Sequence, residues 1–213
     1  MARRKTTARA ARRVDALRPH TEDPNTVDVR AGGTTLATLP RHRAEELGIA
    51  EGTAWTPALA ARVDRACAEA LAREAALAFL AKRPWSAAGL RERLERAGHA
   101  GRAAADAVAA LVADGWLDDR AFAAARVEQL SRRGAMSAEA LEALLGRDGV
   151  DERDARDAAE DGAATVAEVR AEASAARKAR EPAGRVAARL ARRGFDADTI
   201  RDALEHAGYD LGD

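Results

Sequence analysis

Apolar residues four positions apart, followed after another four by a glycine, occur at three places along the chain. The three copies are Leu90/Leu94/Gly98, Leu141/Leu145/Gly149 and Val186/Leu190/Gly194. Residues at i and i+4 share a helix face, and a glycine one turn later can adopt the left-handed conformation that ends a helix. The glycines lie 51 and 45 residues apart, a spacing typical of helical repeats. The pattern therefore predicts tandem helical units with one local design.

From Thr56 onward the sequence predicts helices in groups of three. Thr56-Pro57 is a strong helix start, and the apolar period then runs unbroken to Pro84. Ser86 is placed to begin the short helix of the first copy, and Gly115 ends the helix after it. We therefore expect an all-α protein of three tandem three-helix units in an elongated, curved array: helical repeat 1 with a long lead helix (56–117), helical repeat 2 (118–162) and helical repeat 3 (163–213).

The first two units are joined by Trp116-Leu117-Asp118-Asp119. Its two apolar residues are expected to enter the core. One of its two aspartates is expected to cap the next helix, because a carboxylate at the N-cap accepts hydrogen bonds from free backbone amides. For the same reason, Asp151 and Asp196 are the N-caps expected after the second and third repeat glycines.

Residues 26–55 do not follow the helical period. Val27, Val29, Leu36 and Leu39 lie on either side of Gly32-Gly33, which is typical of a β-hairpin with a glycine turn. A short helix is expected after Pro40. We therefore expect a small β-hairpin extension at 26–55, preceded by a disordered basic tail over residues 1–25.

Composition supports thin, closely packed helices. Of the 213 residues, 47% are hydrophobic but only 3% are aromatic, so the core must consist mainly of Ala and Leu on closely spaced helices. The single cysteine, Cys67, excludes an internal disulfide and fits a reducing compartment. No apolar run approaches the ~20 residues of a membrane span, and the N-terminus lacks the apolar region of a secretory signal. We expect a cytoplasmic monomer.

The net charge of zero conceals separate charged blocks. The N-terminus is basic, which is typical either of a nucleic-acid-contacting arm or of a solvated tail. Acidic residues gather around the second repeat, and basic residues return in the third. The residues predicted to lie near nucleic acid are Arg3, Arg4, Lys5, Arg12 and Arg13, and those predicted to bind a partner are Arg177, Lys178, Arg185, Arg189, Arg192 and Arg193.

Signals for catalysis are absent from the sequence. The four histidines are scattered without companion ligands, and Gly32-Gly33 matches no phosphate-binding loop. Asp118-Asp119 is interpreted as a helix cap rather than as an acid pair. We expect a protein that is not an enzyme and that has no cofactor or metal.

Three separated motifs resemble the RecX family, in the order that the family has them. They are Ala76–Ser86 with the short helix that follows, the junction Gly115–Ala123, and Leu190–Phe195 near the C-terminus. The likeness covers roughly residues 70–208, and residues 26–70 resemble an extension that some members carry. The motif residues are Ser86, Leu90, Leu94, Gly98, Trp116, Leu117, Asp118, Asp119, Phe122, Gly149, Gly194 and Phe195. Gly89 departs from the family pattern, which has an acidic residue there, and Gly134–Ser137 lacks the usual basic lead-in.

The resemblance implies a regulator of the RecA recombinase. Such a protein binds the RecA filament on single-stranded DNA and modulates, mostly by inhibition, its ATPase and strand-exchange activities. Weak direct DNA contact is a further expectation. Two other function classes stay open: a helical protein that binds nucleic acid directly, with steep salt dependence, and a non-catalytic helical adaptor that binds neither RecA nor DNA.

Overall fold

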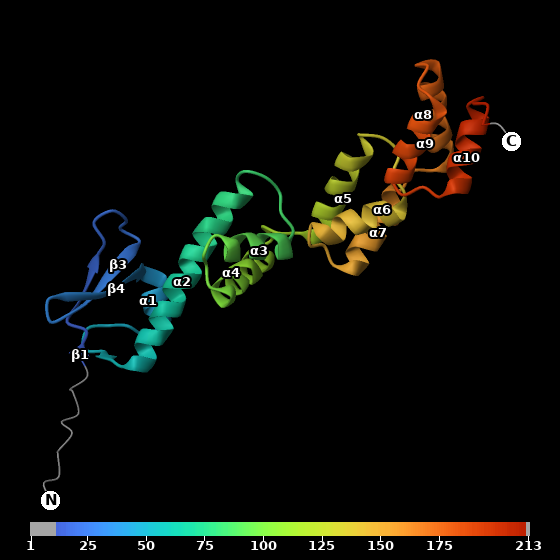
Figure 1. Cartoon of the computed structure of the whole chain (residues 1–213). Helices are drawn as coiled ribbons and strands as arrows, with labels where there is room; N and C mark the ends of the chain where they lie inside the picture. Colours follow the sequence, from blue (N-terminus) through green and yellow to red (C-terminus); the bar gives the residue numbers. More distant parts are fainter. Residues whose placement is uncertain (1–11, 212–213) are drawn as a thin grey trace, which may run out of the picture. The chain divides into compact units, whose positions relative to one another are not determined.

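The computed structural model describes residues 12–211 (Figure 1). This part of the chain is mostly helical, with five short strands near its start and ten helices. It divides into two compact units: residues up to 75 together with 97–107, and residues 76–96 together with 108–213. The predicted mostly helical protein with a small β region is confirmed.

The first unit contains two small antiparallel sheets. β2 (Ala16–Pro19), β3 (Thr26–Ala31) and β4 (Thr34–Pro40) form one sheet in that order, while β1 (Arg12–Arg13) pairs with β5 (Ala54–Trp55). The predicted hairpin is β3–β4, and Gly32-Gly33 turns between them with φ of +59° and +77°. Val27, Val29 and Leu39 on these strands pack with α1 (Arg41–Glu46) and with the start of α2 (Pro57–Leu80).

The predicted tail over residues 1–25 is wrong for its second half. Val14 is only 1% exposed, and Leu17 packs against the same core while β2 pairs with β3. Arg12 and Arg13 form β1, and the Arg13 side chain donates a 2.7 Å hydrogen bond to the Gly52 carbonyl. The strands were missed because their exposed positions carry arginines, which conceal the two apolar residues that face inward. Arg3, Arg4 and Lys5 lie outside the described residues.

The helices after α2 end close to the predicted places. They are α3 (Ala87–Arg96), α4 (Gly101–Ala113), α5 (Asp119–Ser131), α6 (Ala138–Arg147), α7 (Glu152–Gly162), α8 (Val166–Lys178), α9 (Ala183–Arg192) and α10 (Ala197–His206). The apolar pairs of the three copies are completely buried in α3, α6 and α9. Their glycines, Gly98, Gly149 and Gly194, have φ of +96°, +85° and +89°, so the predicted left-handed helix ends are confirmed.

Small side chains form the helix interfaces, as the composition predicted. Ala123, Ala155 and Ala159 pack with Leu141 and Leu145 to join α5, α6 and α7. A second cluster joins α8, α9 and α10 around Ala173, Val186 and Leu190. The carboxylates of Asp151 and Asp196 accept backbone amides as the N-caps of α7 and α10, as expected.

The short helices of successive copies meet end to end. The Ser86 hydroxyl, before α3, donates to the Asp148 carbonyl at the end of α6 and accepts the Gly89 amide. One copy later, the Ser137 amide, before α6, donates to the Arg193 carbonyl at the end of α9 at 3.0 Å. A Cβ on Gly89 would lie 3.1 Å from the Asp148 carbonyl oxygen. The departure from the family pattern at this position therefore has a packing reason.

Two aspartates, at the start of α10 and within it, make the stability of the fold decrease at low pH. The Asp196 carboxylate accepts the Thr199 amide, and Asp202 accepts two hydrogen bonds from Arg170 at 2.7 and 2.8 Å, so the pKa of each carboxyl lies below its usual value of 3.8. A lowered pKa stabilises the fold above the unfolded value, and this stabilisation is lost as pH falls through the folded value. Below about pH 4 we expect the thermal midpoint of unfolding to decrease as the pH is lowered. In Asp202→Asn this decrease should be less steep. A midpoint that depends equally on pH in both proteins would contradict this.

Candidate partner-binding surfaces

The basic residues predicted to bind a partner lie on α8, on α9 and, for Arg193, at the C-cap of α9, and they fall into two groups. Arg177, Lys178, Arg185 and Arg192 are exposed. The Arg177 guanidinium lies 5.2 Å from the centre of the Tyr209 ring, and its Nε donates to the Gly208 carbonyl. These residues remain available to an anionic partner.

Arg189 and Arg193, in contrast, are held by acids of the same unit. Glu172 of α8 accepts Arg189 Nε at 3.0 Å and Arg193 Nη1 at 2.7 Å. Arg189 also donates to Glu181 at 2.5 Å, and Arg193 donates to the Arg133 carbonyl at 2.6 Å. The side chains of Arg189, Arg193, Glu172 and Glu181 are only 20–25% exposed.

This network changes the electrostatics of the predicted surface. Burial of the Arg189 guanidinium opposes its charge, but the hydrogen bonds that it donates to Glu181 and Glu172 outweigh burial and raise its pKa. Two cations and two carboxylates then offset each other inside the cluster. The helical spacing did place four arginines in one region, but it did not show that Glu172 and Glu181 approach two of them. A role of these residues in binding a partner stays a prediction.

The junction between α4 and α5 has an exposed tryptophan. Leu117 enters the core as predicted, but Trp116 is 62% exposed, so its predicted core position is wrong. Asp118 caps α5 by accepting the Ala121 amide, whereas Asp119 accepts the Ala87 amide at 2.8 Å and so caps α3. Because the two aspartates satisfy two helix N-termini, they form no acid pair for catalysis.

Trp116 borders an apolar hollow of about 760 Å³. The hollow lies beside the end of α2 and the turn before α3, and sequence reasoning did not identify it. The only signal was Trp116 itself, since a large aromatic residue in a chain with 3% aromatics needs either core space or a surface role. The lining residues are Leu77, Leu80, Ala81, Lys82, Arg83, Pro84 and Trp116.

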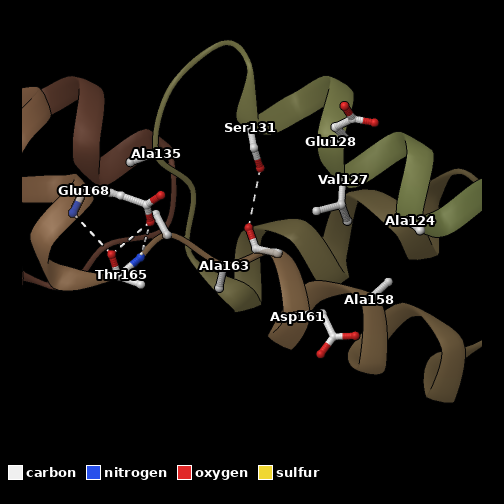
Figure 2. Close-up of a pocket in the computed structure, with 12 residues that line it drawn as sticks. Ala124, Val127, Glu128, Ser131, Ala135, Ala158, Asp161, Ala163, Thr165 and Glu168 are labelled. Carbon is white, nitrogen blue, oxygen red and sulfur yellow. Dashed lines mark hydrogen bonds between the residues drawn. The ribbon is translucent and has the colours of Figure 1, made fainter.

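A second hollow, of about 730 Å³, lies between α5, α7 and the start of α8 (Figure 2). Ala124 and Val127 on α5 face Ala158 on α7, with Ala163 in the connection to α8. Glu128, Asp161 and Glu168 lie at its margins. Glu168 is engaged with Thr165 in the N-terminal capping box of α8, and Glu128 pairs with Arg132. The acids at this hollow are therefore partly committed to local structure.

Within residues 12–211, no group of three or more His, Cys, Asp or Glu side chains is arranged to hold a metal ion. None of the helices in that range is long and apolar enough to cross a membrane. Cys67 is half-buried and donates to the Thr38 carbonyl, and burial raises the pKa of its thiol. A raised pKa disfavours the reactive thiolate.

Comparison with known proteins identifies the family. No family model matches the chain. A protein named Regulatory protein RecX from Chromohalobacter salexigens is 36% identical over 144 residues, which cover 65% of this chain and 94% of that protein. A crystal structure of regulatory protein RecX has a TM-score of 0.72 at 16% identity, covering 91% of this chain and 98% of that one. The structure of RecX from Lactobacillus salivarius has a TM-score of 0.55 at 17% identity, covering 67% and 97%. Both solved structures share the fold, and the sequence match over nearly the whole relative shows that this chain belongs to the RecX family.

Proposed function

We propose that this chain regulates the RecA recombinase by binding the RecA filament on single-stranded DNA, where it inhibits the ATPase and strand-exchange activities. The observation that carries the proposal is the 36% identity to a regulatory protein RecX over 94% of that protein. We infer further that the helices from Pro57 onward form three repeated three-helix units. The end-to-end contacts of Ser86 and Ser137 support this arrangement, because both follow the same local design.

The surface chemistry supports a binding role without catalysis. The charged groups of α8 and α9 and the hollow at Trp116 offer contacts, whereas the paired aspartates at the α4–α5 junction are used as caps. A zero net charge with separated patches suits a partner that presents both protein and phosphate. It also argues against strong unspecific affinity for bare DNA, because such affinity grows with the number of phosphates neutralised.

The decisive measurement is ATP hydrolysis by RecA on single-stranded DNA, with and without the chain. We expect inhibition at concentrations well below those that coat the DNA, and we expect it to persist when the chain is added after filament assembly. Fluorescence anisotropy with a labelled single strand alone gives the affinity for bare DNA. Inhibition that appears only at DNA-coating concentrations, with steep salt dependence, would favour direct nucleic-acid binding. A chain without effect at any concentration would contradict the proposal.

A further inference from the structure

Trp116 is the largest exposed apolar side chain of the described residues that also borders a hollow. It directly follows the turn after α4, and its backbone amide donates to the Leu111 carbonyl at 2.9 Å. Its neighbour Leu117 is buried at 5% exposure, so the backbone is fixed while the indole remains 62% exposed. An indole that stays in water on a fixed backbone gains no stabilisation from burial, although apolar residues elsewhere in the chain are buried. A single exposed apolar residue is ordinary, but one that is continuous with an apolar hollow, as Trp116 is, marks a binding surface.

The hollow beside the indole has a mainly aliphatic wall. Leu77 and Leu80 of α2 and Pro84 of the following turn line it. The volume of about 760 Å³ lies within the range of concave ligand-binding sites and is ample for one bulky side chain. Aromatic residues at the centre of such hollows often contribute most to protein–protein affinity. An apolar side chain of a partner protein is therefore suited to this aliphatic hollow.

The rim of the hollow is cationic. Lys82 and Arg83 line it, and neither makes an ion pair with a carboxylate in the part of the chain that the structure describes. Arg83 is held in place, because its guanidinium lies 3.3 Å from the centre of the Trp85 ring and Nη1 donates to the Pro84 carbonyl at 3.2 Å. A positioned guanidinium without an acidic partner favours a carboxylate from outside, and Arg forms strong hydrogen bonds to carboxylates.

The geometry points to the Trp116 hollow as a docking site for a protein segment that offers one bulky apolar side chain flanked by carboxylates. Within the proposed function, on which this inference rests, the segment belongs to the protein surface of the RecA filament. The exposed Trp116 ring is the face on which a nucleotide base would stack, but the concave aliphatic wall of Leu77, Leu80 and Pro84 favours an apolar side chain of a protein. Lys82 and Arg83 at the rim favour a segment in which acidic residues flank that apolar side chain.

Binding of variants to preassembled filaments tests the site. Trp116→Ala should weaken cosedimentation with RecA filaments by about tenfold or more, as expected for a central aromatic contact, and Lys82→Glu should weaken it by several-fold. The affinity of Trp116→Phe for the filament should lie within about threefold of the parent's, because an aromatic side chain still contacts the partner there. Val112→Ala, another exposed apolar position of the same unit, is the matched control and should bind like the parent. Melting temperatures should be similar for all four, because these side chains are exposed.

Photocrosslinking identifies the partner. A chain with p-benzoylphenylalanine at position 116 is irradiated with filaments on a fluorescently labelled single strand. A covalent product with RecA supports the inference, whereas a product with the labelled strand would overturn it in favour of nucleic acid. Parent-like binding of Trp116→Ala would overturn the docking site alone. A parent chain that fails to cosediment with filaments would overturn the proposed function together with this site.

Discussion

Replacing Gly194 with alanine is expected to destabilise the protein more than the same replacement at Gly98 or Gly149. Gly194 has φ of +89°, which costs a residue with a Cβ about 1–2 kcal/mol. The new Cβ would also lie 2.7 Å from the Ala140 Cβ and against the Ser137 hydroxyl, at the start of α6. The Ala140 methyl group has no torsion that could move it aside, and the Ser137 hydroxyl could rotate away only by losing its N-cap hydrogen bond with the Ala140 amide. Overpacking of this kind adds about 1–3 kcal/mol, so we expect a total of about 3 kcal/mol in chemical denaturation.

Gly98→Ala is the matched control for this substitution. Gly98 ends the first short helix with φ of +96°, nearly the same backbone conformation, but a Cβ there would meet no atom within 4 Å. Only the conformational cost of about 1–2 kcal/mol should remain. The difference between the two variants therefore measures the end-to-end contact between α6 and α9. Equal losses of unfolding free energy would show that this contact contributes nothing.

This contrast also shows how far the sequence predicts the fold. The spacing of Leu90, Leu94 and Gly98 fixed the helix face and the helix end, because both follow from the local backbone period. The contact of Ser137 with Arg193 and Gly194 joins residues that are more than fifty positions apart, and no local pattern encodes it. It was therefore visible only in the structure.

The two main errors have related physical causes. Val14 lies between β1 and β2, and Leu17 lies in β2, within a segment whose exposed positions include arginines, so these two inward-facing apolar residues are hidden in a basic stretch. The place of Trp116-Leu117 at the helix junction, before the capping aspartates, predicts that both residues enter the core, yet only Leu117 does. In both cases, the side of the backbone that faces the core depends on tertiary contacts, which no local sequence pattern shows.

The sequence predicts where the arginines assigned to partner binding lie along the chain, but not their contacts. Helical spacing correctly gathered Arg185, Arg189 and Arg192 on one short helix. It could not show that Glu172 of α8 and Glu181, in the connection between α8 and α9, approach Arg189. Ion pairs between distant segments depend on how the helices pack. The structure therefore separates arginines that are free to bind a partner from those that hold the fold together.

Arg189→Glu is accordingly expected to lower the free energy of unfolding, because Arg189 is held by ion pairs and is not a free surface charge. The substitution breaks ion pairs with Glu172 and Glu181 and places a third carboxylate beside them. Exposed pairs contribute about 0–1 kcal/mol and fully buried ones about 3–5 kcal/mol when broken. With these side chains 20–25% exposed, we expect a loss of about 2 kcal/mol.

Arg185→Glu, one helical turn earlier, separates the structural effect from the functional one. Arg185 is exposed and makes no ion pair in the described part of the chain, and an acid in the first turn of α9 is favourable for the helix dipole. Its unfolding free energy should stay within about 0.5 kcal/mol of the parent. If α9 contacts the filament, Arg185→Glu should still weaken RecA inhibition, whereas a loss confined to Arg189→Glu would follow from unfolding alone. Equal stability of the two variants in urea denaturation would mean that the Glu172 network does not hold α8 and α9 together.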